Sequence, residues 1–97
     1  MFRAELCHDA DGPILRMVGR LVGDWALEAK SLVIETSVIE GLIVDLNEVT
    51  YVDATGEQEL NSLKNLGAVF AAKSVYSSGV CERLGLPVRG NTNERLK

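Results

Sequence analysis

The hydrophobic pattern of this chain changes period along its length, and the order of those changes limits the folds open to it. Apolar and polar residues alternate over residues 2–8 and again over 14–21, which is typical of strands with one buried face. Residues 9–13 between them, Asp-Ala-Asp-Gly-Pro, are dense in turn formers. The chain is therefore expected to open with a β-hairpin, whose second strand turns Arg16 and Arg20 towards solvent.

Helical spacing replaces this alternation from Trp25 onward, with Asp24 as the expected N-cap and a gradual end over residues 35–38. Residues 42–46 then form a nearly continuous apolar run, as expected for a strand covered on both faces. Residues 47–52 are predicted to be a connecting segment. Its larger side chains are expected to pack under the end of the sheet: Val49, Tyr51 and Val52.

Two further helices and one strand follow in the pattern. A leucine face marks a helix that Gly67 ends, and residues 68–72 form a short strand of small apolar residues. A final helix is closed by residues 85–87. Strands that alternate with helices after a hairpin predict an α/β protein, with a mixed β-sheet of about four strands and about three helices packed on it. The apolar residues that mark the two helices are Leu60, Leu63 and Leu66, then Val75, Val80, Cys81 and Leu84.

The length of the chain places these elements in one domain. A chain of 97 residues suffices for a single core. The domain is predicted to span residues 1–87, with a polar and flexible tail over 88–97.

The net charge of −4 argues against binding to nucleic acid or to an anionic membrane surface. No apolar run reaches the roughly 20 residues of a membrane span, and Glu5 lies where a signal peptide would be apolar. A cytoplasmic protein without membrane insertion is expected.

Few side chains suited to catalysis or metal binding are present. His8 is the only histidine, which leaves most Ser-His, Cys-His and multi-histidine metal sites without a member. Cys7 and Cys81 lie far apart without a CxxC motif, and we expect two reduced thiols used in packing. The phosphate-binding loop and nucleophile-elbow motifs of enzymes are also missing. We therefore expect a protein that is not an enzyme and carries no cofactor or metal.

The stretch LIVDLNEVTYVDATG at residues 42–56 resembles the signature of STAS domains, the family of anti-sigma-factor antagonists. That signature is an apolar strand ending in Asp, a short loop, an apolar-aromatic-apolar step, and Asp-x-Ser/Thr-Gly opening a helix. The flanking elements match in order, so the resemblance covers residues 2–87. Glu57-Gln58 stand where the family usually has Leu-Gly, so the chain resembles a divergent member. The positions that carry the resemblance are Asp45, Val49, Tyr51, Asp53, Thr55 and Gly56.

The resemblance implies a STAS-like fold and a bacterial signalling protein that regulates transcription by binding a protein partner. In that family the residue at the position of Thr55 is phosphorylated by a serine/threonine kinase, which is itself the anti-sigma factor. Unphosphorylated antagonist binds the kinase and frees the sigma factor, and the phosphorylated form does not bind. The implied partner-binding residues surround that position: Asp53, Thr55, Gly56, Glu57 and Glu59.

The same residues also have a purely structural interpretation. Thr55-Gly56-Glu57-Gln58 fits a capping box, in which the threonine hydroxyl caps the helix and the glutamine reaches back. Asp53 is either a cap or loop anchor, or a group that orients the threonine hydroxyl. A capping hydroxyl can also accept a phosphate, so the interpretations are compatible. The acidic neighbours would repel an added phosphate or would select a basic partner: Asp53, Glu57 and Glu59.

Two other functions stay open. STAS-like domains also serve as non-catalytic subunits of lipid-transport ATP-driven importers, where they bind the transporter ATPase and Thr55 need not be phosphorylated. The other alternative is a STAS scaffold without a phospho-switch, which forms a homodimer or joins a signalling complex through an edge strand. Trp25 is expected to be a core residue or a lid over a sheet edge, and an interface anchor if it is half exposed.

Overall fold

The computed structural model describes residues 2–10, 12–36 and 41–89, and its elements alternate after an initial hairpin as the hydrophobic pattern predicts. Among these residues, four strands and three helices form an α/β fold, so the predicted fold class is confirmed. The elements in chain order are β1 (Phe2–Asp9), β2 (Gly12–Leu21), α1 (Gly23–Thr36), β3 (Ile43–Val52), α2 (Ala54–Asn65), β4 (Val69–Ala71) and α3 (Val75–Leu84).

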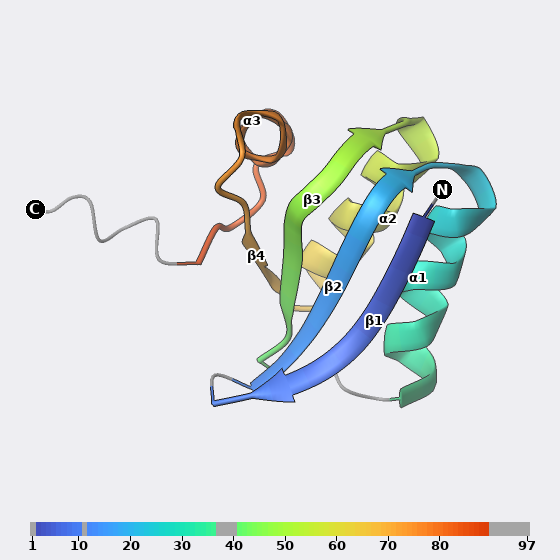
Figure 1. Cartoon of the computed structure of the whole chain (residues 1–97), viewed down its shortest axis with the longest axis vertical. Coiled ribbons are helices and arrows are strands. Elements are labelled where there is room, and N and C mark those ends of the chain that lie inside the picture. The colour runs from blue at the N-terminus through green and yellow to red at the C-terminus, as the bar shows by residue number, and fades with distance from the viewer. Residues whose placement is uncertain (1, 11, 37–40, 90–97) are drawn as a thin grey trace, which may run out of the picture.

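The strands form one mixed sheet in the order β1-β2-β3-β4 (Figure 1). β1 and β2 pair antiparallel, whereas β2, β3 and β4 run parallel to one another. Parallel neighbours need a crossover connection, and α1 and α2 provide the two crossovers. The carboxyl ends of β2 and β3 consequently lie at the same end of the sheet, where α1 and α2 begin.

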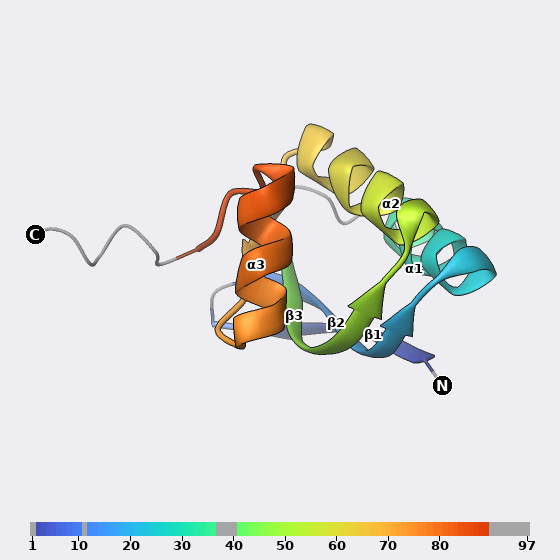
Figure 2. The ribbon, with the colours of Figure 1, turned by 90° about the horizontal axis from the view of Figure 1, so that it is seen from above.

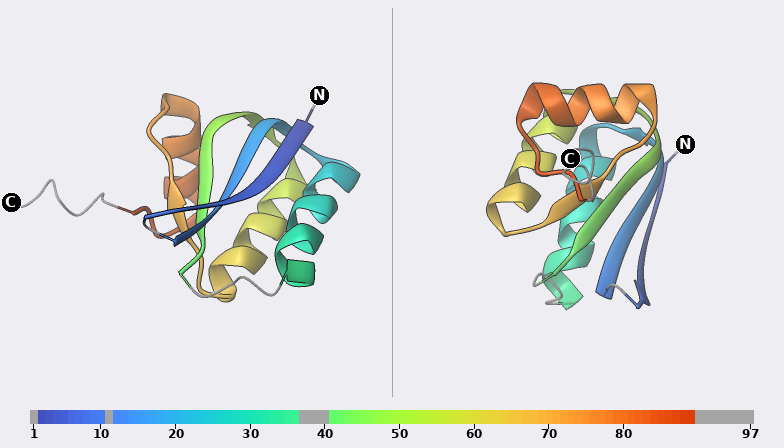
Figure 3. Two further views of the ribbon diagram at one scale, coloured as in Figure 1. Left: turned by 60° about the horizontal axis from the view of Figure 1, so that its bottom comes forward. Right: turned by 90° about the vertical axis from the view of Figure 1, so that its left-hand side faces the viewer.

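Helices cover one face of the sheet, and no helix in the described ranges covers the other. Figure 2 shows α1 and α2 side by side over one face, with α3 beside β3 on the side away from β1, and Figure 3 shows the same layers edge-on. Along β2, Leu15 and Met17 are buried, whereas Arg16 and Arg20 are exposed as the sequence predicts. No helix in the described part of the chain has the length and apolar character needed to cross a membrane. The main core includes Leu15, Met17, Leu21, Ala29, Val33, Val44, Leu46, Leu60, Leu63 and Phe70.

β3 is longer than the sequence predicts. Residues 47–52, expected to be a connecting segment, continue the strand to its end at Val52. The pairing of β2 with β3 shifts register twice, because β3 carries extra residues opposite β2. These irregularities remove the simple alternation by which a strand is recognised. Val49 and Val52 are buried as expected, but Tyr51 is 46% exposed and does not pack under the sheet end.

Two expectations about the helices are also corrected. α1 begins at Gly23, so Asp24 lies inside the first turn and does not cap it, because the Gly23 amide is held by a carboxylate from another segment. Leu66 and Val75 are exposed, since Leu66 follows the last residue of α2 and Val75 is the first residue of α3. Residue 11 of the predicted turn and residues 37–38 of the expected helix end lie outside the described residues.

The segment after α3 returns to the outer edge of β4. Val88 forms a parallel bridge with Phe70, whose amide donates a hydrogen bond to the Pro87 carbonyl. The Phe70 carbonyl in turn accepts from the Arg89 amide. Val88 and Arg89, which the predicted boundary assigns to the tail, thus pair with the sheet. The rest of that predicted tail, residues 90–97, lies outside the described part of the chain.

Both cysteines are free thiols, as the sequence predicts. Cys7 is half-buried on β1, and Cys81 is buried on α3. Burial raises the pKa of the Cys81 thiol because desolvation disfavours the thiolate. Cys81 therefore acts in packing, in keeping with the role expected for it.

Candidate functional site

The predicted strand-to-helix junction is present where β3 passes into α2. β3 ends at Val52, Asp53 follows, and α2 begins at Ala54. The junction lies at the carboxyl ends of the parallel strands β2 and β3, at the top of Figure 1. Open α/β sheets generally bind their ligands at this end, because loops there connect strand ends to helix N-termini.

Asp53 connects three segments of the chain at this junction. Its Oδ1 accepts a hydrogen bond from the Gly56 amide at 2.8 Å, and its Oδ2 accepts one from the Gly23 amide at 3.2 Å. Its own amide donates to the Leu21 carbonyl at 3.3 Å. Asp53 has an extended backbone conformation and is the N-cap of α2, which confirms the cap role proposed for it from the sequence. Both carboxylate oxygens are therefore engaged by the fold.

The capping-box prediction for Thr55 is wrong. Thr55 is the second residue of α2, and Asp53 holds the cap position with the extended conformation that capping requires. Thr55 is half-buried in the first turn of the helix, so it is not sealed beneath other side chains. The Thr55 hydroxyl is therefore not the group that caps α2.

Gly56 lets the helix approach the sheet closely. A Cβ atom at this position would overlap the Leu21 carbonyl oxygen and would lie 2.8 Å from Cγ1 of Val52. Only glycine fits so close an approach without displacing the backbone. Gly56 is buried, so it shapes the junction by packing and presents no side chain to a partner.

The acidic side chains at the start of α2 are paired with cations from other helices. Glu57 accepts a hydrogen bond from Arg83 of α3 at 2.6 Å, and Glu59 lies 3.8 Å from Nζ of Lys30 on α1. The Glu57 side chain is 28% exposed and that of Glu59 only 12%, so Glu57 is the more accessible acid. Of the acids expected around Thr55, Glu57 is thus closely paired with a cation and Glu59 is paired at longer range. In the described part of the chain, no three His, Cys, Asp or Glu residues gather in a way that could hold a metal ion.

Tyrosine side chains complete this end of the molecule. The Tyr76 hydroxyl, from the first turn of α3, accepts a hydrogen bond from the Val52 amide at 2.8 Å. Arg20 lies over the Tyr51 ring, 5.3 Å from its centroid. Both tyrosines are more than one-third exposed, Tyr51 at 46% and Tyr76 at 38%. Tyrosine and arginine are residue types enriched at energetically important interface positions, and this end of the molecule exposes both close to the junction.

Tyr76 is a residue of the junction that sequence reasoning misses. Its partner amide, on Val52, lies 24 positions earlier in the chain and on a different element. The only local signal is an aromatic ring with a polar tip in the first turn of the last helix. That signal does not identify the amide it binds.

The sheet order, the crossovers and this junction together define a STAS-like fold, as the resemblance in residues 42–56 predicts. One similar solved structure is the anti-sigma factor antagonist SpoIIAA in its unphosphorylated form, with a TM-score of 0.64 and 14% identity over 87% of this chain and 82% of that one. Another is an uncharacterized protein of the DUF3478 family with a SpoIIAA-like fold, from Shewanella loihica PV-4. Its TM-score is 0.54, with 11% identity over 90% of this chain and 80% of that one.

The sequence itself matches no protein-family model and no curated protein significantly. Identities of 14% and 11% establish a shared fold alone. Function must therefore be argued from the residues of the junction.

Proposed function

We propose that this protein is a regulatory protein-binding module of the anti-sigma-factor-antagonist type, switched when a partner serine/threonine kinase phosphorylates Thr55. The fold shared with SpoIIAA supports the type of module, and the place of Thr55 in the first turn of α2 supports the switch. The proposed partner is an anti-sigma factor that is itself the kinase, in the bacterial cytoplasm. The proposed partner-binding residues remain Asp53, Thr55, Gly56, Glu57 and Glu59.

The observation that carries the proposal is that capping and the candidate phosphoacceptor belong to different residues. Asp53 caps α2 and also holds the Gly23 amide, so the junction does not depend on the Thr55 hydroxyl. Thr55 is half-buried, and the hydrogen bonds of the cap run from the Gly56 and Gly23 amides to the Asp53 carboxylate. A modification of Thr55 can therefore change the surface without removing the cap.

The start of α2 also favours an added phosphate. The first backbone hydrogen bond of α2 runs from the Glu57 amide to the Asp53 carbonyl at 2.9 Å, so the amides of Ala54 and Thr55 precede it. Free amides and the positive end of the helix dipole stabilise an anion at this position. The phosphorylated protein is thus expected to stay folded.

In this proposal phosphorylation changes partner binding through the charge that it adds to the surface. Phosphorylation adds a charge of about −1.5 to −2 and three acceptor oxygens. Glu57 is already paired with Arg83, so its negative charge is offset locally on the unmodified surface. In this proposal Asp53 and Gly56 shape the site, while Thr55 and Glu57 present side chains to the partner and Glu59 braces α2 against α1.

Phosphorylation can be tested directly. The protein is incubated with ATP and with each serine/threonine kinase encoded near its gene, and phosphate is located by mass spectrometry. Thr55 should be labelled, the Thr55→Val variant should not, and Thr50→Val should be labelled as strongly as the wild type. Thr50 is a suitable control because it is an exposed threonine on β3. Absence of label on Thr55 with every kinase would contradict the switch.

Partner binding gives a second readout. If Thr55 lies in the interface, Thr55→Glu should weaken binding of the captured kinase by tenfold or more, about 1.4 kcal/mol. Thr50→Glu should leave the affinity within about threefold. Binding of a transporter ATPase that is insensitive to Thr55→Glu would instead favour the role of a non-catalytic transporter subunit.

A further inference from the structure

The two edge strands of the sheet differ in length and in whether their outer side is paired. β4, at one edge, is three residues long and pairs on its outer side with the segment at Val88. β1, at the other edge, is eight residues long and pairs only with β2 among the described residues. A long edge strand with unpaired backbone groups is a template for a strand from another chain.

The register of the hairpin shows which residues of β1 turn their backbone groups outward. His8 lies opposite Pro13, which has no N–H, so this pair cannot exchange two hydrogen bonds and is a non-hydrogen-bonded pair. Bonded and non-bonded pairs alternate along an antiparallel ladder. Arg3, Glu5 and Cys7 therefore bond to β2. The N–H and C=O groups turned to the open edge belong to Phe2, Ala4, Leu6 and His8.

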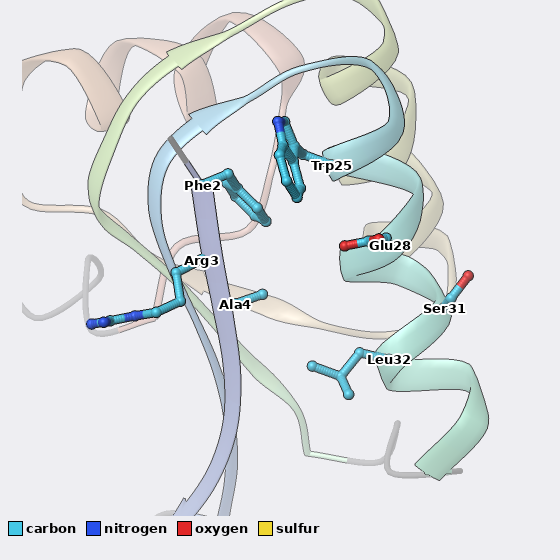
Figure 4. A pocket seen from close by; sticks show the side chains of 7 residues that line it. All are labelled: Phe2, Arg3, Ala4, Trp25, Glu28, Ser31 and Leu32. Carbon is cyan, nitrogen blue, oxygen red and sulfur yellow. The ribbon is translucent and has the colours of Figure 1, made fainter.

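A partly apolar hollow lies along the same edge, beneath the helix-covered face. It has a volume of about 430 Å³ and lies between β1 and α1. Figure 4 shows Phe2 and Ala4 facing Trp25 and Leu32 across it, whereas Arg3 points away. The rings of Phe2 and Trp25 are 6.2 Å apart, and Trp25 is 46% exposed. Trp25 is thus the half-exposed lid over a sheet edge that the sequence predicts as one alternative, with room for a neighbour beside it.

We propose that β1 pairs with β1 of a second copy of this chain, antiparallel and about a twofold axis at Ala4, so that two sheets join into one. In a hydrogen-bonded antiparallel pair, the residues whose N–H and C=O groups face the open edge lie opposite each other. These are every second residue of β1, so the twofold axis of a symmetric pair passes through a residue of β1 and not between two residues. With the axis at Ala4, Phe2 faces Leu6 of the second copy on the helix side. On the open face, Arg3 of each copy faces Glu5 of the other.

Charge selects this register over its neighbours. An axis at Arg3 would place two arginines opposite each other, and an axis at Glu5 would place two glutamates there. Like charges directly opposite in a ladder are destabilising, and opposite charges are stabilising. An axis at Leu6 would leave Glu5 opposite Cys7. The axis at Ala4 is the one that matches both Arg3 and Glu5, each of them exposed in the single chain.

The test is the oligomeric state of the full chain and of charge-reversed variants, by sedimentation velocity over a range of concentrations. The wild type should show a concentration-dependent dimer. Arg3→Glu or Glu5→Arg alone creates two repulsive pairs in each dimer, and the dissociation constant should rise about tenfold or more. The double variant Arg3→Glu/Glu5→Arg restores both pairs, and its dissociation constant should return to within about threefold of the wild type. Glu82→Arg, at an exposed site on α3, is the control that matches the charge change of Glu5→Arg, and it should leave the dissociation constant unchanged.

Two further measurements keep the proposal falsifiable. Ala4→Pro removes an amide turned to the open edge and no hairpin bond, so it should abolish the dimer while circular dichroism shows a folded monomer. Trp25 is the only tryptophan, and its fluorescence should change with protein concentration in the wild type but not in Ala4→Pro. A wild type that stays monomeric at all concentrations would overturn the proposal. So would a double variant that dimerises no more tightly than the single variants.

Discussion

The β3–α2 junction and the β1 edge are built on opposite principles. At the junction, one carboxylate serves two amides, a glycine permits close packing, and a tyrosine hydroxyl binds the last amide of β3. At the edge, backbone groups and an apolar hollow are left open, and the charged side chains are exposed. Changes at the junction should therefore cost stability whatever their effect on binding. Changes at the edge should leave the stability of the single chain within about 0.5 kcal/mol.

Gly56→Ala should have the largest effect. The new Cβ would overlap a backbone carbonyl at Leu21, and the free energy of unfolding should fall by about 3 kcal/mol, measured by urea denaturation. The control is Gly79→Ala in α3, where an added Cβ meets nothing within 4 Å. That variant should gain about 0.5 to 1 kcal/mol, because alanine is the better helix former. Equal effects of the two substitutions would mean that Gly56 is not closely packed.

Asp53→Ala should have an intermediate effect. It leaves the Gly56 and Gly23 amides without their acceptor, and the free energy of unfolding should fall by about 2 kcal/mol. Asp53→Asn keeps one side-chain oxygen for the cap and should lose about half as much. Asp24→Ala, an exposed aspartate inside the first turn of α1, should change stability by no more than about 0.5 kcal/mol. A loss at Asp24 as large as that at Asp53 would contradict the role of Asp53 as the acceptor of both amides.

Tyr76→Phe should have the smallest effect of the three junction variants. It removes the acceptor of the Val52 amide while keeping the ring, and the expected loss is about 1 kcal/mol. Hydrogen exchange of the Val52 amide should accelerate in the variant, which locates the loss. Tyr51→Phe is the matched control, because its ring can still lie under Arg20 and should cost less than about 0.5 kcal/mol. Unchanged exchange at Val52 would show that the hydroxyl is not the acceptor.

The sequence predicts the fold class because the period of the hydrophobic pattern reports which face of each element is buried. The alternation of Leu15 and Met17 with Arg16 is an example that the structure confirms. The same reasoning fails for residues 47–52, where extra residues in β3 break the alternation while the strand continues. A bulge is a property of the pairing of two strands, so one strand's pattern does not contain it.

At the candidate site, the sequence identifies the right stretch and misassigns one role within it. Thr55 to Gln58 fit a capping box as well as Asp53 fits a cap, because both patterns place a side-chain oxygen near a helix start. The choice depends on Gly56, which must lie against the Leu21 carbonyl, and on the Gly23 amide, which Asp53 also binds. Both contacts link segments far apart in the chain. Local spacing therefore could not distinguish the two caps.

The pairing of Val88 with β4 has a consequence for assembly. It pairs β4 at Phe70 with the protein's own backbone, so among the described strands β1 is the edge strand whose whole outer side stays unpaired. Once two β1 strands have joined about a twofold axis, the outer side of β1 is occupied in both copies. Growth by this route then stops at two copies and cannot continue into a fibre.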